Sequence, residues 1–232
     1  MSEEKEKRQI LKNFVVLEGI DGAGTTTQMK AALERREKEA SSGRKLPEFL
    51  WTSEPTTAPT GLFLRRMLKG EFESTGETSA HLFAADRSQH INGSLVMDEG
   101  NRLSTGVRQA CNMGKLVISD RYYFSSLAYQ SIDCGMDLPS RLNEDFPLPE
   151  LLIFFQIDPE ISLARVNSRG EEKEIYEKLD FQKKVALAYE KIMEDVQKEN
   201  KINFLILDAG KKKEEISEII WHEIEKLPIM KG

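Results

Sequence analysis

The sequence contains little cysteine and no long apolar run. Its two cysteines, Cys111 and Cys134, form no C-x-x-C pair and are too few for a disulfide framework, which favours a reducing compartment. No apolar run approaches the length of a membrane span, and the first residues, MSEEKEKRQILKN, lack the apolar core of a signal peptide. We therefore expect a cytoplasmic protein that does not interact with membranes.

The sequence also lacks an excess of positive charge. Its 33 Lys and Arg residues are outnumbered by 39 Asp and Glu residues, and the formal net charge is −6. This balance argues against general nucleic-acid binding, although it is compatible with a locally basic pocket for a small anion. Histidine is scarce too. His81, His90 and His222 fall in predicted helices at spacings that fit no set of metal ligands, so we interpret them as surface or core residues.

The most informative stretch of the chain is FVVLEGIDGAGTTTQ at residues 14–28. Its apolar start predicts a strand buried on both faces, and Gly19, Gly22 and Gly24 predict a loop before a helix. Backbone N–H groups that such a loop turns inward, together with a helix N-terminus, bind polyphosphates. The spacing is that of the motif G-x-x-x-x-G-K-[ST], but Thr25 occupies the lysine position. An ordinary glycine-rich turn is the alternative interpretation.

Apolar segments along the chain predict five strands, with helical patterns between them. The predicted strands span residues 14–18, 48–52, 116–119, 151–157 and 204–207. The predicted helices span residues 28–38, 60–70, 78–96, 125–131, 178–199 and 216–227, with two further helical segments ending at residues 113 and 167. Residues 132–149 hold three prolines and are predicted to be a loop. The alternation predicts an α/β fold with a five-stranded parallel sheet and helices on both faces, as one domain over residues 13–232 after a solvated tail at 1–12.

Polar motifs follow three of these strands, at the edge where parallel sheets bind ligands. The glycine loop follows the first strand, Glu54 the second, and Asp120 with Arg121 the third. A guanidinium group suits a phosphate, and a carboxylate at a strand end suits a metal-bound water. An ion pair between Asp120 and Arg121 is the structural alternative. Three such strand ends together are stronger evidence for a nucleotide site than any one alone.

Taken together, these motifs and several further segments resemble those of the thymidylate kinase family. The resemblance rests on EGIDGAGTTTQ at 18–28, TSEP at 52–55, LFAADRSQH at 82–90, GKLVISDRYYFSSLAYQ at 114–130, PELLIFFQIDPE at 149–160 and FLILDAG at 204–210. It covers most of residues 13–210, and the combination of FAADR with DRY…S…AYQ is its specific part. It implies the P-loop nucleoside monophosphate kinase fold, transfer of the ATP γ-phosphoryl group to dTMP, Mg²⁺ as cofactor, and a homodimer.

The resemblance also implies a role for each matching residue. The residues expected to bind ATP are Gly19, Ile20, Asp21, Gly22, Ala23, Gly24, Thr25, Thr26, Thr27 and Arg165. The residues expected to bind dTMP are Asp21, Pro55, Phe83, Arg87, Arg121, Ser126, Tyr129 and Gln130. The residues expected to act in catalysis are Asp21, Glu54, Asp120, Arg121 and Arg169, and those expected to bind Mg²⁺ are Thr26 and Asp120.

Several of these assignments have a structural alternative. In that alternative Asp21 caps a turn, Phe83 is a core residue, and Arg87 is a surface arginine paired with Asp86. Ser126, Tyr129 and Gln130 then belong to an ordinary helix surface.

The chain departs from the family pattern in four places. Thr25 replaces the lysine that reaches the β- and γ-phosphates, and Ser53 replaces the arginine of the TREP motif. Residues 91–113 are longer than the corresponding family segment. A lid expected around residues 166–178 is short of arginine, with Ile175 at a position where an arginine often stands. These departures leave two alternatives to an active dTMP kinase: a nucleotide-binding protein with weakened catalysis, or a kinase for another deoxynucleoside or its monophosphate.

Without a lysine at position 25, positive charge at the transferring phosphoryl group has to come from elsewhere. We expect Arg169, with Arg165 and Lys173, to supply it, because these cations follow the fourth predicted strand closely. A well-placed arginine contributes roughly 10³–10⁵ in rate to phosphoryl transfer. Arg169→Ala should therefore lose turnover steeply while remaining folded, and near-wild-type turnover would remove Arg169 from the mechanism.

Overall fold

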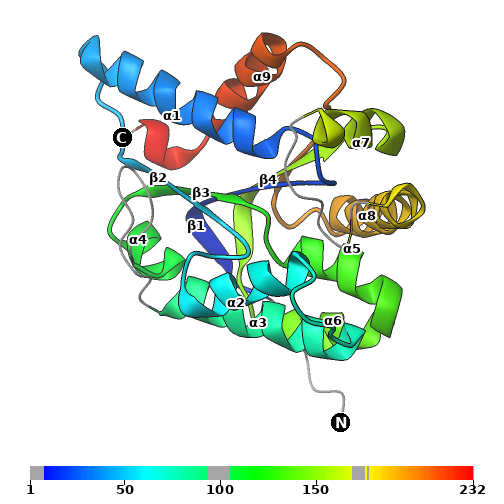
Figure 1. Ribbon diagram of the computed structural model, residues 1–232. Coiled ribbons are helices and arrows are strands. Elements are labelled where there is room, and N and C mark those ends of the chain that lie inside the picture. Colours follow the sequence, from blue (N-terminus) through cyan, green and yellow to red (C-terminus); the bar gives the residue numbers. More distant parts are fainter. Residues whose placement is uncertain (1–7, 94–104, 169–175, 177, 232) are drawn as a thin grey trace.

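The computed structural model describes residues 8–93, 105–168, 176 and 178–231 (Figure 1). Its strands are β1 (Ile10–Gly19), β2 (Phe49–Ser53), β3 (Leu116–Asp120), β4 (Leu148–Gln156) and β5 (Asn203–Asp208). They form one sheet in the order β2-β3-β1-β4-β5, and every neighbouring pair is parallel. The predicted five-stranded parallel sheet is confirmed.

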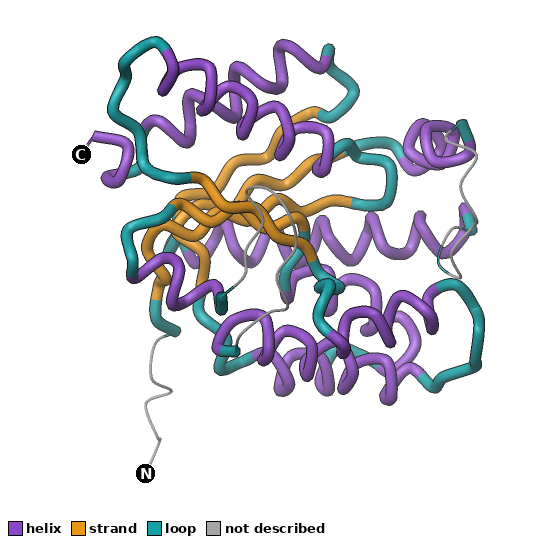
Figure 2. The backbone as a smooth tube through the Cα atoms, turned by 60° about the vertical axis from the view of Figure 1, so that its left-hand side comes forward, coloured by secondary structure: helices purple, strands orange, loops and turns teal. Residues whose placement is uncertain are grey.

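Helices cover both faces of the sheet, as predicted (Figures 1 and 2). One face packs against α1 (Thr25–Ser41) and α9 (Lys213–Glu225). The other packs against α2 (Pro59–Leu68), α3 (Gly76–Asn92), α4 (Val107–Asn112), α5 (Tyr123–Cys134) and α8 (Leu179–Glu199). The remaining helical elements are α6 (Asp137–Asn143), which contacts α3 and α5, α7 (Pro159–Asn167), which contacts α8, and the 3₁₀ turn η1 (Pro228–Lys231).

The uninterrupted apolar run in β1 is explained by burial on both faces. Val15 and Leu17 face α1 and α9, whereas Phe14 and Val16 face the opposite helix layer, and all four are at most 1% exposed. Side chains alternate between the faces of a strand, so a strand in the centre of a two-sided sheet needs apolar residues at every position. Each such side chain contributes about 1.5–3 kcal/mol when fully buried.

Two sequence predictions about the chain's organisation differ from the structure. β1 begins at Ile10, so residues 10–12 belong to the strand rather than to a tail. A register shift between Leu11 and Val15, where Asn13 has a φ of 63°, interrupts the periodic pattern and hides this extension.

The predicted loop at 132–149 was wrong, because α6 and the start of β4 lie there. Pro139 stands in the first turn of α6, where a proline is tolerated.

The parallel register brings three strand ends together at one edge of the sheet. Leu17 of β1 pairs with Asp120 of β3, and Ser53 of β2 pairs with the same Asp120 from the other side. The loops that follow these strands therefore begin side by side. Among the residues that the structure describes, no helix is long and apolar enough to span a bilayer.

Candidate active site

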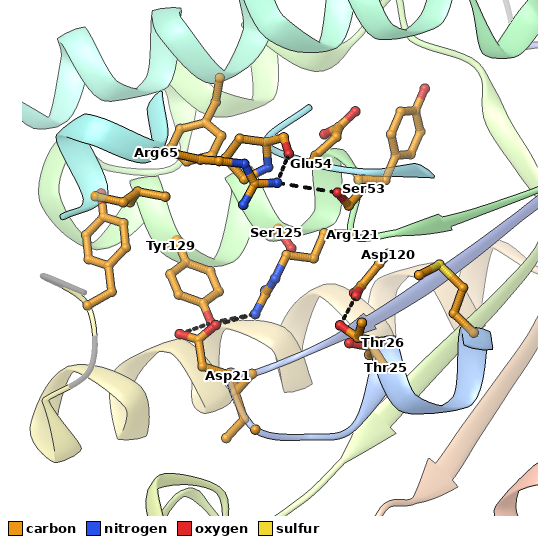
Figure 3. A pocket seen from close by; sticks show the side chains of 18 of the residues that line it. Asp21, Thr25, Thr26, Ser53, Glu54, Arg65, Asp120, Arg121, Ser125 and Tyr129 are labelled. Carbon is orange, nitrogen blue, oxygen red and sulfur yellow. Dashed lines mark hydrogen bonds and ion pairs between the residues drawn. The ribbon is translucent and has the colours of Figure 1, made fainter. Parts of the chain in front are cut away.

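A pocket of about 370 Å³ opens where these strand ends meet (Figure 3). The predicted site residues that line it are Ile20, Asp21, Gly22, Gly24, Thr25, Thr26, Thr27, Glu54, Pro55, Phe83, Arg87, Asp120, Arg121, Tyr129 and Gln130. The lining residues that the sequence prediction missed include Met29, Trp51, Arg65, Ser125 and Tyr176. Residues from the glycine loop and from the ends of β2 and β3 thus share one cavity with side chains of α2, α3 and α5.

The glycine loop between β1 and α1 has the conformation of a phosphate-binding loop. Gly22 has a φ of 85°, and a Cβ there would lie 2.5 Å from the carbonyl oxygen of Ser162, so only glycine fits between the loop and α7. Gly24 has a φ of 97° and is the N-cap of α1. The free N–H groups at the start of α1 therefore face the pocket beside the loop, an arrangement that favours an anion.

Thr26 and Asp120 meet across the pocket floor, where the Thr26 hydroxyl donates a hydrogen bond to Oδ2 of Asp120 (Figure 3). Both offer hard oxygen ligands of the kind that Mg²⁺ prefers. Within the described residues, no group of three or more His, Cys, Asp or Glu could hold a metal ion. A site with one carboxylate and one hydroxyl fits a metal that takes its other ligands from water and substrate phosphates.

Arg121 lies in a turn that is fixed to the end of β1. Its φ of 74° is unusual for a residue other than glycine, and its N–H donates to the carbonyl of Leu17 at 2.8 Å. Its guanidinium Nη2 lies 2.5 Å from Oδ1 of Asp21 and 3.4 Å from the Tyr129 hydroxyl. Burial favours a lower pKa for Arg121, but nearby Tyr129 and Asp21 outweigh it and raise the pKa. The side chain therefore stays charged, and it pairs with Asp21 rather than with Asp120.

Asp21 connects the glycine loop to three other elements. Besides Arg121, it accepts hydrogen bonds from the Tyr129 hydroxyl at 3.2 Å and from Nε2 of Gln182 at 2.8 Å. Gln182 is in α8 and was not predicted, because an amphipathic pattern identifies the buried face of a helix but not a polar contact made at its start. Asp21 is thus more than the cap of a turn.

Glu54 anchors a buried network behind the pocket. Its carboxylate accepts hydrogen bonds from Nε of Arg87 and Nδ1 of His90, both at 2.8 Å, and Nε2 of His90 lies 2.7 Å from the Thr52 hydroxyl. Burial favours a higher pKa for Glu54, but the charge of Arg87 and the hydrogen bond from His90 outweigh it and lower the pKa. Glu54 is therefore an anion, and both of its oxygens hold neighbouring side chains.

Arg87 is not the surface arginine of the structural alternative, since it is only 1% exposed. Besides Glu54, it donates to Oδ1 of Asn143 at 2.5 Å and to the hydroxyl of Ser126 at 3.0 Å. Asp86 instead accepts hydrogen bonds from Thr56 and Thr60.

His90 is fully buried, which confirms a core position, but its contact with Glu54 was not foreseen.

The other predicted residues lie around the pocket rather than in its described lining. Ser126 is buried behind Arg87, and Gly19 and Ala23 pack beneath the glycine loop. Arg165 donates to the carbonyl of Ala209 at 3.1 Å. Most of the expected lid falls on residues 169–175 and 177, so Arg169, Lys173 and Ile175 lie outside the described residues.

A buried carboxylate, that of Glu18, sits directly under the Arg121 turn. Oε1 accepts hydrogen bonds from the backbone N–H groups of Tyr122 and Ser125, which are the N-cap and third residue of α5. Oε2 accepts from the hydroxyls of Ser125 and Tyr189, both at 2.7 Å. Glu18, in β1, thus caps the N-terminus of α5, and a helix N-terminus stabilises a carboxylate anion. Burial nevertheless outweighs these contacts and raises its pKa to about 7.

Known proteins are similar to this chain along most of its length. Residues 17–220 match the family model described as Thymidylate kinase. The thymidylate kinase of Leptospira interrogans serogroup Icterohaemorrhagiae serovar copenhageni (strain Fiocruz L1-130) is 38% identical over 183 residues, 78% of this chain and 81% of the relative. A Treponema pallidum (strain Nichols) protein is 35% identical over 218 residues, 94% of this chain and 97% of the relative.

The raised pKa of Glu18 predicts a pH dependence of stability. Because the pKa rises from 4.5 to about 7 on folding, the folded state holds the proton more tightly, and stability falls as pH rises through that window. Relative to Glu18→Gln, the wild-type free energy of unfolding should fall by about 3 kcal/mol as the pH rises from 4.5 to about 7.

Denaturant titrations at several pH values measure this difference. Glu214→Gln serves as the control, because Glu214 is exposed. A wild-type minus Glu18→Gln difference that stays constant with pH would contradict the assignment of a titrating carboxyl at this position.

Proposed function

This chain belongs to the thymidylate kinase family, and from that premise we propose that it transfers the γ-phosphoryl group of ATP to dTMP, giving dTDP and ADP. The phosphorylation of dTMP follows from the family. The observation that supports the finer proposal is the shared pocket: the phosphate-binding loop, the Arg121 side chain and the hydrogen-bonded pair Thr26 and Asp120 all line one cavity. Phosphoryl transfer needs mainly positioning and electrostatic stabilisation, so two anion-binding elements in one cavity suit it.

On the ATP side, we assign the grip on the phosphates to backbone amides at residues 22–27 and to the N-terminus of α1. Thr26 and Asp120 would hold Mg²⁺, directly or through water. When bound, this ion neutralises charge that develops on the phosphate oxygens. Thr25 supplies a hydroxyl where the motif has a lysine, so backbone dipoles contribute a larger share of the binding here than in a loop with an ammonium group.

On the acceptor side, we assign the phosphate of dTMP to Arg121 and the thymine ring to the face of Phe83. Arg87 and Gln130 would read the polar edge of the base, with Ser126 holding the Arg87 guanidinium in place. Tyr129 and Asp21 lie together next to the sugar position, where a tyrosine ring would crowd a 2′-hydroxyl and favour deoxyribose. Glu54 acts by fixing Arg87 as a charged group.

We further propose a single kinase domain that begins with β1 at Ile10 rather than at residue 13, with a lid at about 166–178, and that works as a homodimer in the cytoplasm. A protein with weakened catalysis is the main alternative, and the absence of a lysine at position 25 favours it. The network around Arg121 and Arg87 opposes it, because a protein that had lost catalysis would not need a complete acceptor pocket.

A substrate panel separates these possibilities. With Mg·ATP and a coupled assay for ADP release, dTMP should give the highest kcat/KM among dTMP, dUMP, dCMP and thymidine. We expect dUMP, which lacks one methyl group, to be poorer by about 10- to 200-fold. Zero turnover with retained dTMP binding would support the weakened protein, and a higher kcat/KM for another substrate would reassign the acceptor.

A further inference from the structure

His90 connects two neighbouring side chains at the end of β2 without lining the pocket itself. Its Nδ1 lies 2.8 Å from Oε1 of Glu54, and its Nε2 lies 2.7 Å from the Thr52 hydroxyl. Side chains two residues apart leave an extended chain on the same side, so one imidazole ring of α3 can contact both. His90 is fully buried and is absent from the described lining of the pocket, whereas Glu54 belongs to that lining. His90 can therefore act on a bound nucleotide only through its neighbours.

Arg87 contacts the same carboxylate from one turn earlier in α3. Nε of Arg87 lies 2.8 Å from Oε2 of Glu54, and Nη2 lies 2.6 Å from the same oxygen. Residues three apart in a helix are neighbours on its surface, so Arg87 and His90 reach Glu54 side by side. Each takes one oxygen: Oε2 binds the guanidinium, and Oε1 binds the imidazole. The carboxylate is thus held at both oxygens, which fixes its orientation.

This division differs from the usual geometry of an arginine–carboxylate pair. A guanidinium and a carboxylate commonly form two parallel hydrogen bonds, one to each carboxylate oxygen. Here both Arg87 nitrogens share Oε2, and Oε1 is held by His90. Since the Glu54 anion can only accept hydrogen bonds, Nδ1 of His90 carries the proton of this contact. Without that donor, Glu54 would be free to turn both oxygens towards Arg87, and the guanidinium plane would rotate with them.

The plane of the Arg87 guanidinium determines where its last N–H group points. A guanidinium has five N–H groups. Among the contacts of the described residues, four of these groups face a partner: two face Glu54, one faces Oδ1 of Asn143 and one faces the hydroxyl of Ser126. The fifth, on Nη1, is the group left to donate to a ligand, and Arg87 lines the pocket. The direction of this N–H therefore depends on how Glu54 is held.

We propose that His90 is a positioning residue for recognition of the acceptor base: it holds Oε1 of Glu54 and thereby sets the plane in which Arg87 presents its remaining N–H. The proposal deepens the proposed function and rests on it, because there Arg87 reads the polar edge of thymine. Where thymine carries the O4 acceptor, cytosine carries an N4 amino donor. A correctly oriented N–H thus favours dTMP over dCMP, because a donor that faces a donor stays unpaired.

Two conservative variants of His90 separate the contributions of its ring nitrogens. The amide nitrogen of Asn lies near the position of Nδ1, so His90→Asn keeps the donor to Glu54. The longer side chain of Gln reaches the position of Nε2, so His90→Gln keeps a partner for Thr52 alone. His90→Gln should lower kcat/KM for dTMP by about 10- to 100-fold, the range for a hydrogen bond to a charged group, and lower the ratio of kcat/KM for dTMP over dCMP by about tenfold.

His90→Asn should keep this ratio within about threefold of wild type, which is less than the contribution of one such hydrogen bond. KM for ATP should change little in either variant, because the contacts at issue are on the acceptor side. His81→Gln is the matched control: it changes an exposed histidine of the same helix that is absent from the described lining, and it should alter neither the ratio nor KM. Thermal melting of all three variants reports the loss of stability separately from the ratio.

A dTMP over dCMP ratio in His90→Gln equal to that in His81→Gln would overturn the proposal and leave the proposed function intact. Equal losses in the two His90 variants would also overturn it, since they would point to packing of the ring rather than to the Nδ1 donor. If the wild type binds dTMP without turnover, the proposed function fails. The ratio of the dissociation constants for dTMP and dCMP, measured by titration calorimetry, then decides the role of His90 by the same criteria.

Discussion

The turn that carries Arg121 depends on one buried carboxylate, that of Glu18. This side chain caps α5 by accepting hydrogen bonds from the N–H groups of Tyr122 and Ser125, and it accepts another from the hydroxyl of Tyr189 in α8. Glu18 also stands directly before the glycine loop, at the end of β1. Leu17, whose carbonyl accepts the Arg121 N–H, and Glu18 therefore hold the Arg121 turn on the central strand, and the phosphate-binding loop begins directly after them. The sheet, rather than flexible side chains, sets the separation between the loop and the turn.

Charge compensation organises the rest of the pocket in the same way. Arg87 with Glu54 and Arg121 with Asp21 are pairs in which the carboxylate orients a guanidinium. The Arg87–Glu54 pair is buried, and such a pair contributes little net stability because desolvation offsets much of its attraction, but it gives a defined geometry. The Arg121–Asp21 pair is half-buried. The unusual features of this chain, a threonine at position 25 and a serine at position 53, each remove a cation that the family pattern places in the site. In the proposed function, the backbone amides of the loop take over part of the role of the missing lysine.

Much of the fold and part of the site could be predicted from the sequence, and the residues explain the difference. The five strands were visible because burial on both faces produces unbroken apolar runs, as in Phe14–Leu17. Asp120 and Arg121 were visible because they directly follow such a run, whereas the role of Asp21 was predicted from the resemblance to the family. His90, Gln182 and Arg65 were not assigned to the site, because they lie in helices, where periodicity indicates a face but not a partner distant in sequence. α6 was missed because three prolines suggest a loop, although one of them stands in its first turn.

The central claim is that an acceptor nucleotide binds with its phosphate on the Arg121 side of the pocket and its base against Phe83. A crystal structure of the protein with dTMP tests this claim most directly. The account predicts a phosphate oxygen within hydrogen-bond distance of the Arg121 guanidinium and a thymine ring parallel to the Phe83 ring. A nucleotide bound away from both residues, or no bound nucleotide at saturating dTMP, would contradict it.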